Sequence, residues 1–165
     1  FTLGVTQIIG FGTLFYAFGV IVTPMSADLD LTVPSAYAAL SAALLIGTTG
    51  LLDPSDERFA GTIAAVEREL LEGPTVYRYK YDDGLPGGEG GFHFCTTWLI
   101  DAYAAVGRTG DAWGLFKKYT ALAGPTGLLP EEYDPATGRS LGNHPQAYSH
   151  AGLIFNALRL AASQG

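Results

Sequence analysis

Cysteine and basic residues are scarce in this 165-residue chain. The single cysteine, Cys95, excludes an internal disulfide framework. Acidic residues outnumber basic ones and give a formal net charge of −7, which disfavours a nucleic-acid partner because the phosphate backbone is also negative. The three histidines are not spaced with Cys95 as metal ligands would be. We therefore expect no metal site and no cofactor.

Charge is absent from the first part of the chain. All nine Lys and Arg lie at or after Arg58, and residues 1–27 carry no charge at all. The apolar run Leu3–Thr23 is long enough to cross a bilayer as a helix. A second charge-free run, Leu31–Leu52, is richer in Ala and Ser and is a weaker candidate. A buried helical hairpin in a soluble core is the alternative interpretation of the two runs.

The N-terminal run also carries a motif. Gly-x-x-Gln-x-x-Gly-x-Gly, followed by Pro-Met-x-x-Asp-Leu, resembles the first transmembrane helix of bacterial major facilitator superfamily transporters. The resemblance covers about residues 1–47 and implies membrane association through residues 3–23. We accordingly divide the chain into a hydrophobic, transporter-like helical hairpin at 1–49 and a second unit at 50–165.

Beyond residue 50, apolar residues recur at helical spacing and predict four helices. The four lie at Ser55–Leu71, Phe92–Val106, Gly110–Ala123 and Gln146–Ala162. Asp53, followed by Pro54, is expected to cap the first of them. At most one short strand pair is expected, near Val76–Tyr81. The two long loops each lead into the start of a helix, so both can lie at one end of the helix bundle.

Acidic side chains mark both long loops. Glu131 and Glu132 follow a Gly-Pro helix stop and precede a turn, so their carboxylates can face an open pocket. An acidic surface loop is the simpler alternative. Glu89 lies in a glycine-rich loop just before a helix start, where it can either serve a binding site or cap the helix.

Four ordered blocks of sequence resemble the C-terminal part of glycoside hydrolase family 15, the glucoamylases and their trehalase-like relatives. The blocks are Gly-Leu-Pro-Gly-Gly-Glu-Gly-Gly-Phe, Cys-x-x-Trp-Leu-x-Asp-Ala, Gly-Leu-Leu-Pro-Glu-Glu-Tyr-Asp-Pro-x-Thr-Gly and Leu-Gly-Asn-x-Pro-Gln-Ala-Tyr-Ser-His-x-Gly-Leu. They run in order between about residues 50 and 162. The resemblance implies an all-α fold, a partial (α/α)6 barrel of about four helices, in which the helices at 92–106 and 146–162 are inner.

The resemblance also implies inverting hydrolysis of an α-glucosidic bond in a glucoside or oligosaccharide, as in glucan 1,4-alpha-glucosidases. Its general base falls on Glu131. The residues expected to contact substrate are Glu89, Glu132, Tyr133, Gln146 and Ser149. The family's general acid lies in an earlier segment that has no counterpart here, so we expect these 165 residues alone to be inactive.

Two other functions stay open at the level of sequence. The chain can be a fragment of a membrane transport protein, or a non-catalytic helical module that binds carbohydrate. We expect the hydrolase part to be cytoplasmic, with membrane association if the N-terminal helices form. We also expect self-association through barrel faces left exposed.

Overall fold

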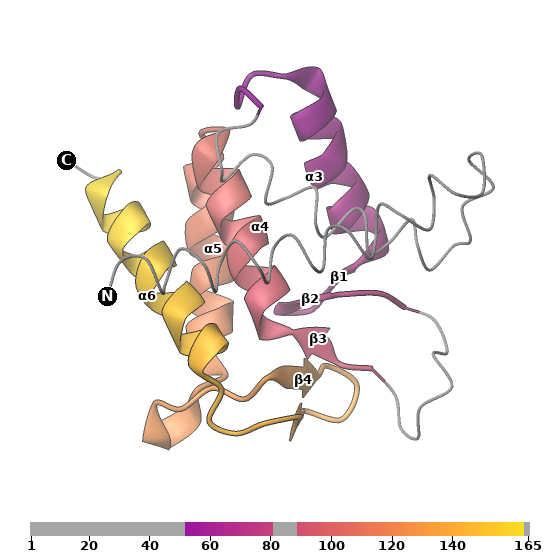
Figure 1. Ribbon diagram of the computed structural model, residues 1–165, viewed down its shortest axis with the longest axis vertical. Helices are drawn as coiled ribbons and strands as arrows, with labels where there is room; N and C mark the ends of the chain where they lie inside the picture. The colour runs from indigo at the N-terminus through magenta and orange to yellow at the C-terminus, as the bar shows by residue number, and fades with distance from the viewer. Residues whose placement is uncertain (1–51, 81–88, 164–165) are drawn as a thin grey trace, which may run out of the picture.

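The computed structural model describes residues 52–80 and 89–163 (Figure 1). The helices are α3 (Glu57–Glu69), α4 (His93–Ala105), α5 (Thr109–Ala121) and α6 (Ala147–Ala162), with a short 3₁₀ helix, η1, at Gly124–Thr126. The strands are β1 (Leu71–Glu72), β2 (Thr75–Tyr77), β3 (Gly91–Phe92), β4 (Glu132–Asp134) and β5 (Arg139–Leu141). The four helices expected beyond residue 50 are confirmed. The hairpin expected at 1–49 lies outside the described residues.

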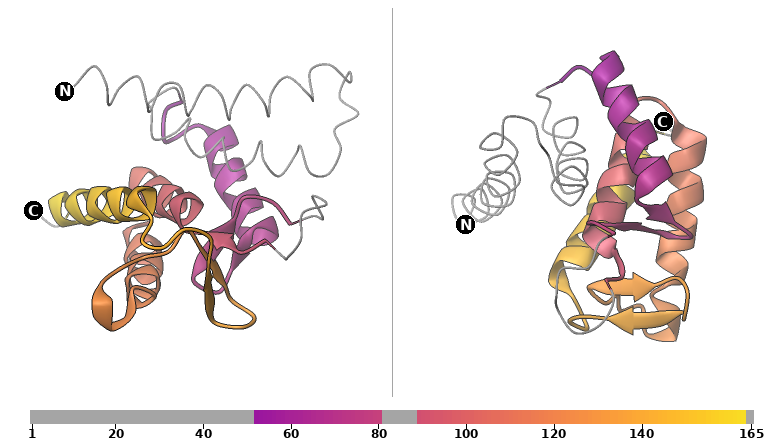
Figure 2. Two further views of the ribbon diagram at one scale, coloured as in Figure 1. Left: turned by 60° about the horizontal axis from the view of Figure 1, so that its bottom comes forward. Right: turned by 90° about the vertical axis from the view of Figure 1, so that its right-hand side faces the viewer.

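Helix α4 is the centre of the helical part. It packs against α5, α6 and strand β2, with α3 on a further side (Figures 1 and 2). Nine of its thirteen residues are buried, Leu99, Ile100 and Ala102 completely. A helix that is apolar on most of its circumference is stable only when other elements surround it, and the neighbouring elements supply that cover.

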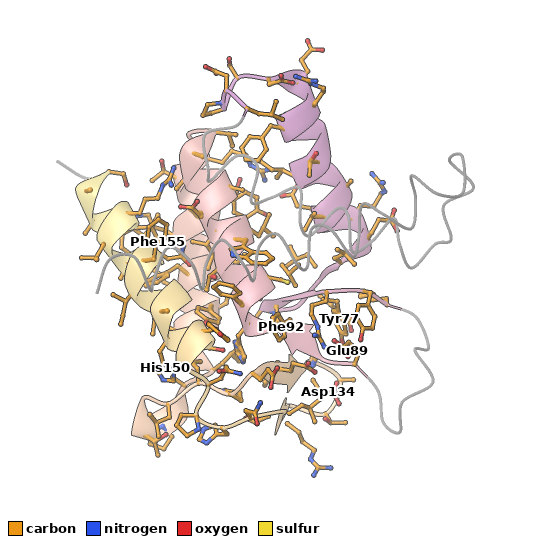
Figure 3. The ribbon with its side chains drawn as sticks, in the orientation of Figure 1. Tyr77, Glu89, Phe92, Asp134, His150 and Phe155 are labelled. Atoms are coloured by element: carbon orange, nitrogen blue, oxygen red, sulfur yellow. The ribbon has the colours of Figure 1, made fainter. Side chains whose placement is uncertain are left out.

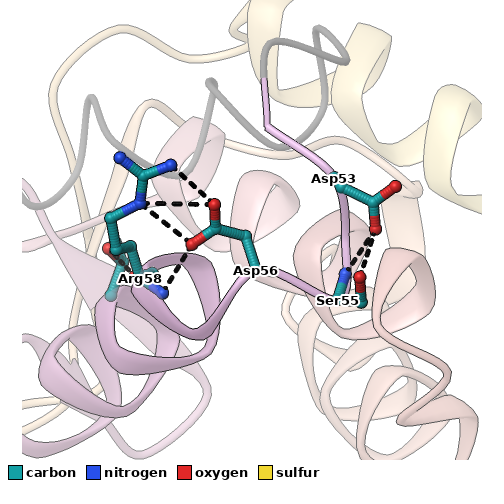
Figure 4. Close-up of polar contacts among 5 residues, drawn as sticks. Asp53, Ser55, Asp56 and Arg58 are labelled. Atoms are coloured by element: carbon teal, nitrogen blue, oxygen red, sulfur yellow. Dashed lines mark hydrogen bonds and ion pairs between the residues drawn. The ribbon is translucent and has the colours of Figure 1, made fainter.

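The N-cap of helix α3 lies three residues later than the cap predicted at Asp53. Its N-cap is Asp56, whose side chain accepts a hydrogen bond from the main-chain N–H of Arg58 at 2.8 Å (Figure 4). Asp53 instead accepts from the main-chain N–H of Ser55 at 2.8 Å and forms the turn before the helix. Both aspartates have the preferred residue type for a cap, and the path of the chain decides which one serves.

The prediction of an all-α fold with at most one strand pair is wrong. The five strands form one antiparallel sheet in the order β1-β2-β3-β4-β5. Each strand has only two or three residues, too few to produce the alternating pattern that identifies a strand in sequence. In the pairing of β3 with β4, Gly91 lies opposite Tyr133 and Phe92 lies opposite Glu132. The expectation that the two loops meet at one end of the bundle is confirmed by this pairing.

Close backbone approach explains two of the glycines. A Cβ on Gly152, in α6, would lie 2.6 Å from Cγ2 and 2.8 Å from Cβ of Thr97, in α4. A Cβ on Gly91 would overlap the side chain of Thr75. Gly152 therefore lets α6 approach α4, and Gly91 leaves room for the Thr75 side chain where β3 pairs with β2.

Across the described helices, none is both long enough and apolar enough to cross a membrane. The run Leu3–Thr23, for which membrane association was expected, lies outside the described residues.

Candidate active site

The loop before the two glutamates is tied to the first turn of α6. The main-chain N–H of Gln146 donates to the carbonyl of Leu129 at 2.9 Å, and the hydroxyl of Ser149 donates to the carbonyl of Pro130 at 2.7 Å. The N–H of Leu129 donates to Nε2 of His150 at 3.2 Å, and Nδ1 of His150 bonds the carbonyl of Gln146 at 2.7 Å (Figure 3). His150 therefore carries its proton on Nδ1, and the loop is anchored immediately before residue 131.

Both main-chain polar groups of Glu131 form hydrogen bonds. Its carbonyl accepts from the N–H of His93 at 3.0 Å, and its N–H donates to the carbonyl of Asn143 at 2.9 Å. Its side chain is half-buried. Oε2 accepts two hydrogen bonds from Asn143, one from the main-chain N–H at 3.0 Å and one from the side-chain amide at 2.8 Å. Among the described residues, Oε1 accepts none.

A glycine makes this contact sterically possible. Gly142 has φ +69°, in the left-handed region that glycine adopts without strain. A Cβ at this position would lie 2.8 Å from both Cβ and Oε2 of Glu131. Any larger residue would push the carboxylate away from Asn143.

The second glutamate belongs to a separate charged cluster. Nη2 of Arg78 lies 3.2 Å from Oε1 of Glu132, and Nε of Arg78 donates to Oε1 of Glu89 at 2.8 Å. The main-chain N–H of Gly90 donates to Oε2 of Glu132 at 3.2 Å. The guanidinium of Arg78 also stacks on the ring of Phe92, 4.5 Å from its centroid. One arginine therefore joins Glu89, in the loop before β3, to Glu132, in β4; the labelled Glu89 and Phe92 mark this region in Figure 3.

Burial raises the pKa of the Glu132 carboxyl, and the negative charge of Glu89 raises it further. The hydrogen bond from Gly90 and the positive charge of Arg78 oppose that rise without cancelling it. Glu131 and Glu132 therefore lie in different electrostatic surroundings. Glu131 is half-open to an approaching molecule, and Glu132 is nine-tenths buried.

Capping of the following helix by Glu89 is not observed. The N-cap of α4 is Phe92, which makes no side-chain capping bond. Glu89 bonds Arg78 instead. The carboxylate therefore belongs to the charged cluster and not to the helix terminus.

The other predicted substrate contacts are placed near the same loop. Tyr133 is half-buried in β4, between Gly91 of β3 and Ser140 of β5. Gln146 is half-buried at the N-cap of α6. Ser149 is 1% exposed and its hydroxyl is engaged by Pro130. Direct contact with substrate stays a prediction for all three, and Ser149 has a visible role in holding the loop.

Two residues of the site were missed in sequence. Arg78 falls in the segment where a short strand pair was expected, and Asn143 falls in the last of the four motifs, but neither was predicted to belong to the site. Arg78 lies 54 residues from Glu132 and Asn143 lies 12 residues from Glu131. The one local signal was the Leu-Gly-Asn sequence, since a glycine before an asparagine is typical of a tight turn that presents its amide groups.

Beneath the site lies a histidine without a hydrogen-bond partner for either ring nitrogen among the described residues. His93 is fully buried, with its ring 5.2 Å from that of Tyr119. Burial, together with the nearby His150, lowers the pKa of His93 to about 4. Within the described ranges, no three His, Cys, Asp or Glu side chains gather so as to hold a metal ion.

The sequence matches the model of Glycosyl hydrolases family 15 over residues 26–158. The matched range begins inside the segment assigned above to a transporter-like hairpin, and the comparisons give no support to the transporter resemblance. No solved structure matches the chain.

Several curated relatives of the chain are named trehalase. The protein of Mycobacterium tuberculosis is 42% identical over 114 residues, 67% of this chain and 17% of the relative. The protein of Mycolicibacterium smegmatis is 42% identical over 120 residues, which are 70% of this chain and 18% of the relative. The protein of Thermoplasma volcanium is 39% identical over 123 residues, which are 73% of this chain and 20% of the relative.

The aligned part of the chain thus spans about a fifth of the length of these relatives. The family match covers well over half of the chain, and the site loops, with Glu89, Glu131 and Glu132, lie within it. This chain therefore belongs to glycoside hydrolase family 15.

Proposed function

We propose that this chain is part of a glycoside hydrolase that cleaves the α-glucosidic bond of trehalose with inversion, and that Glu131 is its general base. The observation that carries the proposal is the similarity, near 40% identity, to trehalases of Mycobacterium and Thermoplasma. Their shared name favours trehalose over a 1,4-linked glucan, so a glucoamylase-type substrate is the weaker expectation. The four helices would form part of an (α/α)6 barrel.

The geometry of Glu131 suits a base. One oxygen is held by Asn143, and the other accepts no hydrogen bond from the described residues. In the proposed step a water oxygen bonds the anomeric carbon and passes a proton to Oε1 of Glu131. The bond from that carbon to the bridging oxygen breaks, its electron pair goes to the bridging oxygen, and a second carboxylic acid protonates that oxygen.

In inverting glycosidases the two carboxyl groups stand about 6.5–9.5 Å apart, which leaves room for the water. Glu132 is unsuited to the acid role, because its carboxyl is buried and bonded to Arg78 and Gly90. We expect the acid in the part of the longer relatives that this chain does not span. Glu89 and Glu132 would contact sugar hydroxyls through the edge of the charged cluster, with Tyr133 and Gln146 beside them.

A chimera tests the proposal. In the Mycolicibacterium smegmatis trehalase, the 120 aligned residues are replaced by those of this chain, so that the relative supplies the remaining barrel and its acid. The chimera should hydrolyse trehalose and release α- and β-glucose in equal amounts before mutarotation, because inversion changes the configuration of only one of the two sugars. Proton NMR of the fresh products measures this ratio.

The control is the same chimera with Glu131→Gln, which keeps the size of the side chain and removes the basic oxygen. We expect it to retain its fold and lose hydrolysis. Release of α-glucose alone, or full activity of the Glu131→Gln chimera, would rule out Glu131 as an inverting base.

A further inference from the structure

Asn143 donates two hydrogen bonds to the same carboxylate oxygen of Glu131. The main-chain N–H and the side-chain amide of Asn143 donate to Oε2 of Glu131 at 3.0 and 2.8 Å. In return, the N–H of Glu131 donates to the carbonyl of Asn143 at 2.9 Å. The two residues therefore make three hydrogen bonds with each other, although they are exposed or only half-buried.

We propose that Asn143 is a positioning residue, which fixes the rotation of the Glu131 carboxylate so that Oε1 alone faces the reacting water. The inference rests on the function proposed above, and it concerns the orientation of the base rather than its identity. Asn143 does not itself touch substrate in this arrangement.

The physical argument starts from the torsion at the end of a glutamate side chain. Rotation about this bond is broad, because the sp³–sp² torsion has no deep staggered wells. A carboxylate bonded by one donor can pivot around it. Two donors with fixed relative geometry define the direction of the carboxylate plane, and hydrogen bonds to an ionised acceptor are stronger than neutral ones.

The neighbouring glycine supports the same interpretation. The left-handed conformation of Gly142 turns the chain so that the N–H of the next residue points at Glu131, and its missing Cβ leaves room for Oε2. A turn needed only to connect β5 with α6 would not require this approach to a side chain. The loop is therefore shaped around the carboxylate.

The test is NMR of the full 165-residue chain with ¹³C,¹⁵N-labelled glutamate and asparagine, the Glu131 signals being assigned by their loss in Glu131→Ala. In the unsubstituted chain the two γ-protons of Glu131 should be inequivalent, with couplings of a single rotamer: these couplings report the torsion about Cβ–Cγ, which the two donors to Oε2 fix together with the rotation of the carboxylate. The side-chain amide of Asn143 should show protons shifted by hydrogen bonding. Equivalent, averaged γ-protons in the unsubstituted chain would overturn the proposal.

Asn143→Asp is the decisive variant. Aspartate has the same shape and the same tolerance of turns, but its side chain accepts hydrogen bonds and repels Oε2. We expect the Glu131 couplings to average while the melting temperature changes little. Ser140→Asp is the matched control: it adds the same charge to an exposed position of β5, and its hydroxyl makes no hydrogen bond in the described structure.

If Asn143 only fills a turn, Asn143→Asp will leave the Glu131 rotamer as it is, and the proposal fails. If Asn143→Asp does not fold, Asn143→Ala replaces it, because alanine removes the side-chain donor and keeps the main-chain donor. An unchanged Glu131 rotamer in Asn143→Ala would likewise refute the proposal. A chimera that does not hydrolyse trehalose would refute the proposed function instead, whatever the NMR result, so the two failures are distinguishable.

Discussion

The side chains of Glu131 and Glu132 are adjacent in sequence but bind opposite parts of the molecule. Glu131 accepts both of its side-chain hydrogen bonds from Asn143, after β5. Glu132, the first residue of β4, is bonded by Arg78 and Gly90 on the side of β2 and β3. Glu131 lies at the bend just before β4 and Glu132 lies in the strand itself, and this change of backbone direction separates two carboxylates that look equivalent in the sequence.

The first prediction compares these two acids. In the chimera, Glu131→Gln should lower kcat by at least about 10²-fold, because a positioned general base contributes on the order of 10²–10⁴-fold. Glu132→Gln should lower it by less than about tenfold, because Gln can still accept the hydrogen bond from Gly90. Steady-state trehalose hydrolysis measures both. The reverse order of effects would move the base by one residue.

The second prediction concerns His93 and pH. Its pKa is about 4 in the folded chain, against an ordinary value near 6.5, because the ring is buried and lies near His150. Between these values the unfolded chain binds a proton that the folded chain does not. Stability is therefore fully present above pH 6.5 and is lost as the pH falls towards 4, by about 2–3 kcal/mol at pH 4.5.

Chemical denaturation at pH 7 and 4.5 checks this. His93→Phe keeps an aromatic ring beside Tyr119 and cannot titrate, so its stability should fall less between the two pH values than that of the unsubstituted chain. His144→Phe, at an exposed position, is the control and should leave the pH dependence unchanged. Equal pH dependence in all three chains would contradict the assignment.

The third prediction is steric. Gly152→Ala should destabilise the fold by about 1–3 kcal/mol, because the new methyl group would meet the β-branched side chain of Thr97, which is 2% exposed and cannot move aside. The same change in α5, Gly114→Ala, meets no atom within 4 Å and should stabilise by about 0.5–1 kcal/mol. Thermal unfolding of the two variants gives the comparison. Two shifts of the same sign would show that α6 does not need this glycine.

The fourth prediction concerns association. Helix α6 leaves Ile154, Phe155 and Leu158 exposed by 60%, 55% and 68%, on one apolar side. Apolar patches of this kind promote contact between molecules. We expect the chain to self-associate in sedimentation velocity runs, and the pair Phe155→Lys and Leu158→Lys to shift it towards monomer. Leu128→Lys, which adds a charge at an exposed leucine outside α6, should have no effect. Monomeric sedimentation of the unsubstituted chain over a wide concentration range would contradict this.

The helices were predictable because their signal is local. In α3 the buried residues Phe59, Ile63 and Val66 recur at helical spacing, and the structure places its ends within two residues of those predicted. The most buried helix, α4, has an apolar circumference, so its length was visible in sequence but its packed faces were not. The strands were invisible, since a two-residue strand such as β3 has no period to detect.

What the sequence determined by itself was the existence of four helices, the two acidic loops between them and, through four ordered motifs, the family. These are properties of neighbouring residues. Only the tertiary structure decided that Arg78 joins Glu89 to Glu132 and that Asn143 holds Glu131, because these pairs lie 11, 54 and 12 residues apart. No spacing rule connects such residues. Their contacts form when β3, β4 and β5 pair and α6 packs on α4, and that geometry gives two neighbouring carboxylates different environments.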